Sequence, residues 1–370
     1  MLLLTCGLVV SCGGALRNQT LASNAPDVAP DRARSSALNE PFRFFSATSF
    51  WNTPVPANAP LDPRSAELAG AFGAEAASEV QEDEEGKQGP WISIDTTAYS
   101  VPIYTVPADQ PTVQVTLKGG KASALQAAWD AVPLPPEAQP AAGTDGHLMV
   151  WQPSTNRLWE FWRLVHGTEG WYASWGGAMQ DVSSDPGVYG PRAWPGAKPG
   201  WGASASSLSI AGGLITLEDL QLGQINHALE IAIPEVWAGE YASPAQRTDG
   251  KSSSPLSLPE GAHLRLDPHL NLAALHLPRL TLMMAEAAQR YGIYVRDGGP
   301  VVAFYAQDPV STGTNPYLGP TGYFEGKNPM ALLASFPWSH LQLLRMNLLP
   351  KRHKPQRSRR HKPQRRRSKA

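Results

Sequence analysis

Short runs in which apolar and polar residues alternate make up much of the chain after residue 100. A period of two is typical of β-strands with one buried face. The clearest run is Gln224–Ile233, which places Ile225, His227, Leu229 and two further isoleucines on one face. The other runs predicted as strands are 100–106, 112–117, 147–151, 157–164, 171–175, 262–266 and 291–306, the last as a hairpin that turns at 297–300.

Two segments carry helical signals instead. Thr216 and Asp219 have the spacing of a capping box, and Gly223 would end the short helix that they open. Residues 280–291 form a second amphipathic segment, followed by Gly292. Because strands outnumber helices and do not alternate with them, we predict a mainly β fold, a single jelly-roll-like β-sandwich over residues 42–346 with a few peripheral helices.

The two ends of the chain have a different character. Residues 1–12 resemble a lipoprotein-type signal, with Cys12 as the lipidated residue, and a plain secretory signal is the alternative. Residues 13–41 are rich in Ala, Ser, Asp and Pro and predict a flexible tether. We therefore expect an outward-facing lipoprotein held at the cell envelope by a lipid anchor in the membrane, or otherwise a secreted protein.

Charge separates the predicted domain from its C-terminal end. The net charge is −1, but residues 351–370 hold 11 of the 31 Lys and Arg residues and no acid, which leaves 20 basic against 32 acidic residues elsewhere. An acidic body argues against nucleic-acid binding. We predict that 347–370 is a disordered basic tail, which either contacts anionic envelope polymers or is an extension without a role.

Most standard catalytic motifs are absent, including GxSxG, GxxxxGK[ST], HExxH, GxGxxG and CxxC. The absence of these motifs argues against serine hydrolases of the nucleophile-elbow type, P-loop proteins and common zinc proteases. The spacing of His263, Asp267, His269 and His276 fits no standard metal site, so we expect neither a metal nor another cofactor.

The most suggestive segment is 145–164. If Pro153–Asn156 is the loop of a hairpin, His147 and Glu160 become diagonal neighbours on one face, with Asp145 at its edge. A histidine beside a carboxylate within an aromatic wall suits acid–base chemistry on a sugar, so these three residues are the candidate catalytic groups. The alternative is that His147 and Glu160 pair with each other in the core.

Aromatic residues suggest where a ligand could stack. The chain has 12 Trp, and Trp151 and Trp162 lie on the same predicted face as His147. We take both as candidate ligand-binding residues, because the apolar faces of sugar rings stack on tryptophan. His227 is a third candidate, with a hydrogen-bonded core histidine as the alternative.

Several short motifs occur in a fixed order: Asp145-x-His147, Trp159-Glu160-Phe161, Gly223-x-Ile225-x-His227-Ala-Leu229, Pro244-Ala245-Gln246 and Tyr291-Gly292. Together they resemble a family of secreted, functionally uncharacterised bacterial proteins. The chain departs from that pattern at Gly146, where arginine is common, and at Arg247, where histidine is common. The resemblance implies relatives but no reaction.

We therefore expect a carbohydrate-active protein that cleaves a polysaccharide or envelope glycan by acid–base chemistry. A non-catalytic glycan-binding lipoprotein and a structural surface protein are the alternatives. Paired ionisable groups in a groove would favour the enzyme, whereas exposed tryptophans without such groups would favour the binding protein.

Overall fold

The computed structural model describes residues 43–84 and 91–351. The chain divides into two units, Met1–Glu40 and Pro41–Ala370, and all the described helices and strands belong to the second. The predicted signal with Cys12, the tether and residues 352–370 of the predicted tail lie outside the described residues. Within those residues, no helix combines the length and the apolar character needed to cross a bilayer.

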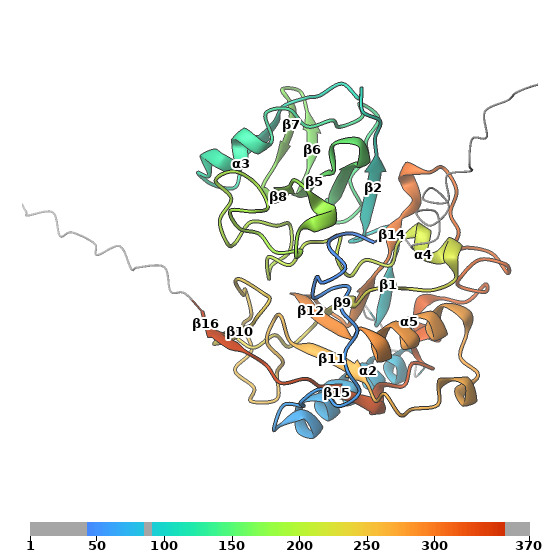
Figure 1. The fold of residues 1–370 in the computed structure, drawn as a ribbon. Helices are drawn as coiled ribbons and strands as arrows, with labels where there is room; N and C mark the ends of the chain where they lie inside the picture. The colour runs from blue at the N-terminus through green and yellow to red at the C-terminus, as the bar shows by residue number, and fades with distance from the viewer. Residues whose placement is uncertain (1–42, 85–90, 352–370) are drawn as a thin grey trace, which may run out of the picture. The chain divides into compact units, whose positions relative to one another are not determined.

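The first of two larger sheets has six strands and mixes parallel with antiparallel pairs (Figure 1). Its order is β1 (Ser93–Asp95), β13 (Ala303–Tyr305), β9 (Leu229–Ile233), β12 (Ile293–Gly298), β11 (His263–Leu266) and β15 (Leu341–Leu343). Strand β9 runs parallel to β12 and antiparallel to β13. Both neighbours of β9 therefore come from the single segment 293–305.

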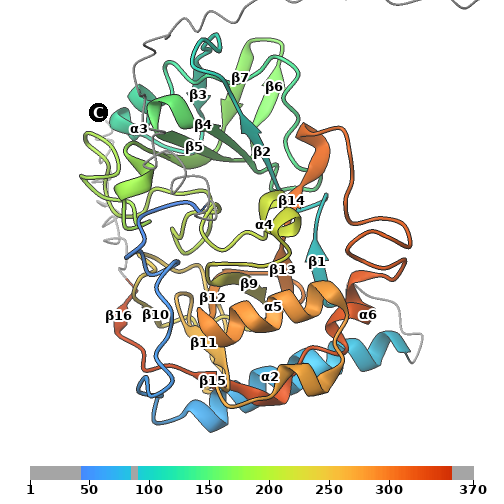
Figure 2. The same cartoon turned by 45° about the vertical axis from the view of Figure 1, so that its right-hand side comes forward.

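Helices cover one face of this sheet, as Figure 2 shows. They are α2 (Ser65–Glu84), α5 (Arg279–Arg290) and α6 (Pro329–Leu333). On α2 the buried residues Leu68, Phe72 and Ala76 recur every fourth position, so they form one stripe. Alternation along β9 sends Leu229 and Ile231 into the core shared with these helices. Glu230 consequently points to the opposite face of the sheet.

The second large sheet has five strands and belongs to a separate hydrophobic core. Its order is β14 (Gln307–Asp308), β2 (Val101–Thr105), β4 (Leu148–Gln152), β5 (Arg157–Trp162) and β8 (Trp175–Met179). Two smaller sheets are formed by β3 (Val115–Leu117), β7 (Gly170–Ala173) and β6 (Val165–Gly167), and by β10 (Glu240–Ala242) with β16 (Leu348–Pro350). The remaining helices are α3 (Ser123–Ala128), α4 (Leu217–Leu222), η1 (Pro153–Thr155), η2 (Val182–Ser184), η3 (Leu272–Leu275), η4 (Pro309–Ser311) and η5 (Trp338–His340).

The predicted mainly β class is confirmed, with about 26% strand and 21% helix, but a single jelly-roll sandwich is not. The sheets are open, and parallel pairs such as β2 with β4 depart from the antiparallel pattern of a jelly roll. The predicted hairpin over 291–306 is wrong, because β9 lies between its two arms. The predicted tail began at 347, but its residues Leu348–Pro350 form β16, which pairs with β10.

Two local predictions are confirmed. Helix α4 opens with a capping box in which Thr216 and Asp219 bond reciprocally, and Gly223 ends it with a left-handed backbone (φ 70°). Helix α5 follows the predicted amphipathic segment to within a residue at each end. Helix α2, rich in Ala and Glu, was not predicted.

Candidate active site

The predicted hairpin forms with the predicted register. Strands β4 and β5 pair Met149 with Glu160 and Gln152 with Arg157. The loop is η1 followed by Asn156 in the left-handed conformation, which asparagine tolerates well. The hairpin thus brings the candidate residues onto neighbouring strands, but their surroundings differ from the expectation.

Glu160 is fully buried, and its carboxylate is occupied by its own chain. The amide of Ala203 donates to Oε1 (2.8 Å), while the Ser209 hydroxyl (2.7 Å) and the Ile210 amide (3.1 Å) donate to Oε2. Burial raises the pKa of Glu160, and these donors oppose the rise. Glu160 therefore ties the 203–210 segment to the five-stranded sheet and presents no surface to a substrate.

His147 is also buried, with 3% of its surface exposed, and it makes no hydrogen bond to Glu160. Neither ring nitrogen has a hydrogen-bond partner among the described residues. Burial and the positive charge of Arg296 lower the pKa of His147 to about 4, although Asp145 opposes them. His147 is therefore a neutral imidazole at neutral pH.

Arg296 on β12 is the centre of a buried polar cluster on the sheet face opposite the helices. Its Nη1 donates to Glu230 Oε1 (2.5 Å), and its Nε donates to Asp297 Oδ2 (2.8 Å). Its guanidinium carbon lies 3.4 Å from the centre of the Tyr305 ring. Nη2 of Arg296 and Oε2 of Glu230 are buried without a partner in the described chain. Such atoms cost about 1–3 kcal/mol each, so this cluster is not built for stability alone.

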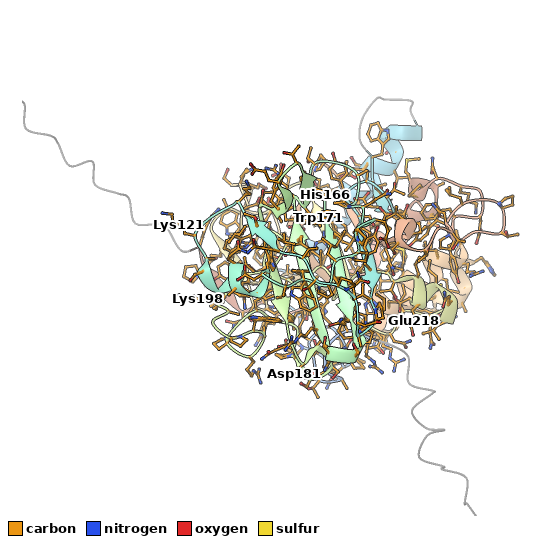
Figure 3. The ribbon with its side chains drawn as sticks, turned by 90° about the horizontal axis from the view of Figure 1, so that it is seen from above. Lys121, His166, Trp171, Asp181, Lys198 and Glu218 are labelled. Carbon is orange, nitrogen blue, oxygen red and sulfur yellow. The ribbon has the colours of Figure 1, made fainter. Side chains whose placement is uncertain are left out.

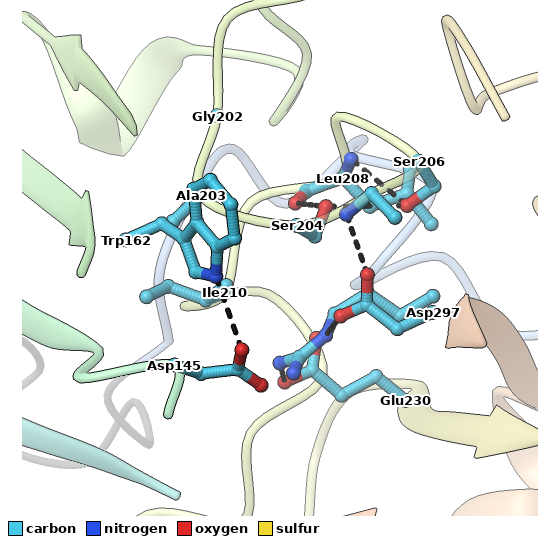
Figure 4. Close-up of polar contacts among 12 residues, drawn as sticks. Asp145, Trp162, Gly202, Ala203, Ser204, Ser206, Leu208, Ile210, Glu230 and Asp297 are labelled. Carbon is cyan, nitrogen blue, oxygen red and sulfur yellow. Dashed lines mark hydrogen bonds and ion pairs between the residues drawn. The ribbon is translucent and has the colours of Figure 1, made fainter. Parts of the chain in front are cut away.

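A loop between the sheets connects this cluster with Glu160. The Ala205 amide donates to Asp297 Oδ1 (2.5 Å), two residues after Ala203 donates to Glu160. From the other side, Arg247 donates to the carbonyl groups of the same loop, with Nη2 on Ser204 (2.6 Å) and Nε on Ala205 (3.0 Å). Figure 4 shows this loop together with Glu230 and Asp297.

Asp145 and Trp162 are the predicted residues that keep partial contact with solvent. The Trp162 indole N–H donates to Asp145 Oδ1 (3.1 Å), and the Arg163 guanidinium lies 4.4 Å from the centre of the Trp162 ring. In Figure 4 the Asp145 carboxylate points toward the side of the cluster that holds Glu230. The edge of the predicted site is therefore its most accessible part.

A second half-buried carboxyl, Asp95 at the end of β1, completes the arrangement. The Ser93 hydroxyl donates to its Oδ1 (2.8 Å). Burial raises the pKa of Asp95 to about 6; Ser93 and Arg296 oppose the rise, and the charge of Asp145 adds to it. Asp95 on β1 and Asp145, which precedes β4, thus interact electrostatically, and the buried cation Arg296 also acts on Asp95. A carboxyl with such a pKa can donate a proton near neutral pH, while an ionised neighbour stabilises positive charge.

Neither Asp95 nor Arg296 was predicted from the sequence as a site residue. The available signals were weak: Arg296 follows the apolar run Ile293–Val295, where a buried charge demands partners, and Asp95 ends a three-residue strand. Neither residue lies near Asp145 in the sequence. Only the packing of the two sheets brings them into one site.

The remaining predicted ligand-binding residues are core residues. Trp151 is 8% exposed and packs edge-on against Phe44. His227 lies 3.1 Å from Asp219 Oδ2 and 2.9 Å from the Ala228 carbonyl oxygen. Both partners accept, so both ring nitrogens donate; burial lowers the pKa of His227, but Asp219 outweighs it and the pKa is raised. His227 thus matches the alternative of a hydrogen-bonded core histidine.

Another tryptophan, Trp171 on β7, is also covered, because His166 stacks on it at 4.4 Å and 10° (Figure 3). In residues 43–84 and 91–351, no three His, Cys, Asp or Glu side chains gather in a way that could hold a metal ion.

Comparisons of the chain with family models, with curated proteins and with solved structures give no match. The family resemblance therefore rests on the motifs alone.

Proposed function

We propose that this protein is a carbohydrate-active protein of the cell envelope that cleaves a polysaccharide by acid–base chemistry at Asp95 and Asp145. The observation that carries the proposal is the electrostatic interaction between two half-buried carboxyl groups, Asp95 on β1 and Asp145 just before β4, the first with its pKa raised to about 6. Glycosidic bonds are broken by such a pair, in which one carboxyl donates a proton and the other acts ionised.

Each group has a role in this proposal. Asp95 is the proton donor, because burial keeps part of it protonated near neutral pH. Asp145 is the second carboxyl of the pair, and the Trp162 indole N–H orients it. Trp162 offers a half-buried ring on which a sugar can stack. Arg296 fixes a positive charge that limits the rise in the pKa of Asp95.

The location follows from the sequence. A lipid on Cys12 would hold the domain at the membrane facing outward, where an envelope glycan or polysaccharide is within reach. The basic tail would add attraction to anionic envelope polymers. Nucleic acid is not an expected partner.

A non-catalytic glycan-binding function is the second candidate, and one observation favours it. Trp162 and Asp145 lie side by side as an aromatic ring with an acceptor at its edge, an arrangement that can bind a sugar without any proton transfer. The expected catalytic pair, His147 and Glu160, has little or no exposed surface. If Asp95 contributes only binding, the same surface describes a binding protein.

An assay of the purified full-length protein on a panel of polysaccharides distinguishes the enzyme from the binding protein. It follows the release of reducing ends and the absorbance of unsaturated products. Cleavage is expected to fall at least about a hundredfold in Asp95→Asn and Asp145→Asn, as for loss of a general acid or its partner. Asp109→Asn, an exposed carboxyl, is the matched control.

The pH profile adds an independent check. With Asp95 as the acid, the rate should decline as the pH rises through about 6. Binding without cleavage anywhere in the panel would establish the glycan-binding alternative. Cleavage that survives in both variants would remove this pair from the chemistry.

A further inference from the structure

A groove of about 810 Å³ is lined in part by Arg247, whose guanidinium donates to the loop that connects Glu160 with Asp297. Its wall includes the segment Ser243–Thr248 together with Leu349 and Lys351. The groove does not include Asp95 or Asp145. It is therefore a separate site from the carboxyl pair.

The charge of the groove is one-sided. Its described lining residues contain two cations, Arg247 and Lys351, and no acidic side chain. This contrasts with the body of the chain, in which acids outnumber bases. Burial lowers the pKa of Arg247, and the nearby acids Asp297, Glu260, Asp249 and Glu160 oppose that effect without lining the groove.

Arg247 has donor capacity to spare. Nε and Nη2 are used on the carbonyl groups of Gly202, Ser204 and Ala205, which fixes the plane of the guanidinium. Nη1 makes no hydrogen bond within the described part of the chain and keeps some exposed surface, so it can donate to a ligand. A fixed guanidinium with a free N–H edge is well suited to a carboxylate.

The rest of the lining suits a sugar ring. Pro199, Pro244 and Leu349 provide apolar surface for its C–H faces, and the exposed Ser243 can bond its hydroxyl groups. Lys351 Nζ is 3.1 Å from the Gly250 carbonyl oxygen, which holds the second cation at the rim.

We infer that this groove binds a carboxylate-bearing sugar unit, with Arg247 and Lys351 as its anion-recognising groups. The choice of a saccharide as the anion rests on the proposed function. The 203–205 loop connects the groove to the Arg296 cluster through hydrogen bonds. Arg247 donates to the Ala205 carbonyl oxygen, and the Ala205 amide donates to Asp297. Asp297 in turn accepts from Arg296. The substrate class is then an acidic polysaccharide rather than a neutral one.

The test is titration calorimetry of the full-length protein with oligogalacturonate and oligoalginate, against a cello-oligosaccharide of equal length as the neutral probe. The acidic probes should bind and the neutral probe should bind at least about tenfold more weakly. Arg247→Gln should weaken acidic binding by about tenfold or more, as expected for losing a charged hydrogen bond. Since this variant also releases the loop, Lys351→Gln is the second variant, with an expected loss of about two- to fivefold.

Lys354→Gln is the matched control, because it removes the same charge from the basic tail. If Lys354→Gln weakens binding as much as Lys351→Gln, the tail binds the sugar and the inference is overturned. Equal binding of acidic and neutral probes, or no binding of either acidic probe, also overturns it. Acidic binding without cleavage would refute only the proposed catalysis, whereas cleavage of neutral glycans alone would refute only the groove.

Discussion

Replacing Asp95 with asparagine should make the protein more stable at neutral pH while it lowers the cleavage activity at least about a hundredfold. The ordinary pKa of an aspartate is 3.8, and in the folded chain burial raises that of Asp95 to about 6. A raised carboxyl pKa means that the unfolded chain releases this proton more readily than the folded one. The folded state therefore loses stability as the pH rises from about 4 through about 6.

The size of this change in stability follows from the rise in the pKa of Asp95 on folding. A difference of about two pH units corresponds to about 3 kcal/mol once the carboxyl is ionised in both states, because one unit is worth about 1.4 kcal/mol. Asparagine has no charge to bury, and its side-chain oxygen can still accept from the Ser93 hydroxyl. Allowing for the exposed part of the group, we expect Asp95→Asn to gain about 2–3 kcal/mol at pH 8. Below pH 4 the gain should shrink to less than about 1 kcal/mol.

Urea unfolding of the wild type and the variant, repeated from pH 4 to pH 8, measures this difference directly. For a chain of this size the gain corresponds to a rise of about 3–5 °C in Tm at pH 8. Asp109→Asn, which removes an exposed charge, should change stability by less than about 0.5 kcal/mol at every pH. Two outcomes would refute the assignment of Asp95 as a buried carboxyl with a raised pKa: a variant less stable than the wild type at pH 8, or a gain in stability that does not change with pH.

Two other substitutions test the structural roles assigned above. Glu160→Gln should destabilise the chain by about 2–4 kcal/mol, because an amide cannot accept from all three donors of the 203–210 segment. Urea unfolding measures the change, with the exposed Glu169→Gln as the control. Unchanged stability would contradict the buried, hydrogen-bonded position of Glu160. Cys12→Ser should move the protein from the membrane fraction to the soluble fraction on cell fractionation, since it removes the lipidation site; a wild type that is already soluble would disprove the anchor.

Local interactions explain which parts of the structure could be predicted. The β4–β5 register depends on a short loop and on alternation along two adjacent strands, and both can be read from about twenty consecutive residues. The capping box of α4 and the apolar stripe of α5 depend on residues three or four apart. Helix α2 was missed because its Ala- and Glu-rich sequence carries only a weak apolar stripe.

The arrangement of the sheets and the composition of the site required the tertiary structure. Alternation shows which face of a strand is buried, but it does not identify the neighbouring strand. The sequence alone therefore placed β12 and β13 in a hairpin, whereas β9 inserts between them. By itself the sequence determined the mainly β class, the charged tail and the 145–164 hairpin that carries Asp145. Only tertiary packing decided that the 203–210 segment would seal Glu160. Packing also decided that the charge of Asp145 would act on Asp95. The sequence could not show either result, because the residues involved lie far apart in the chain.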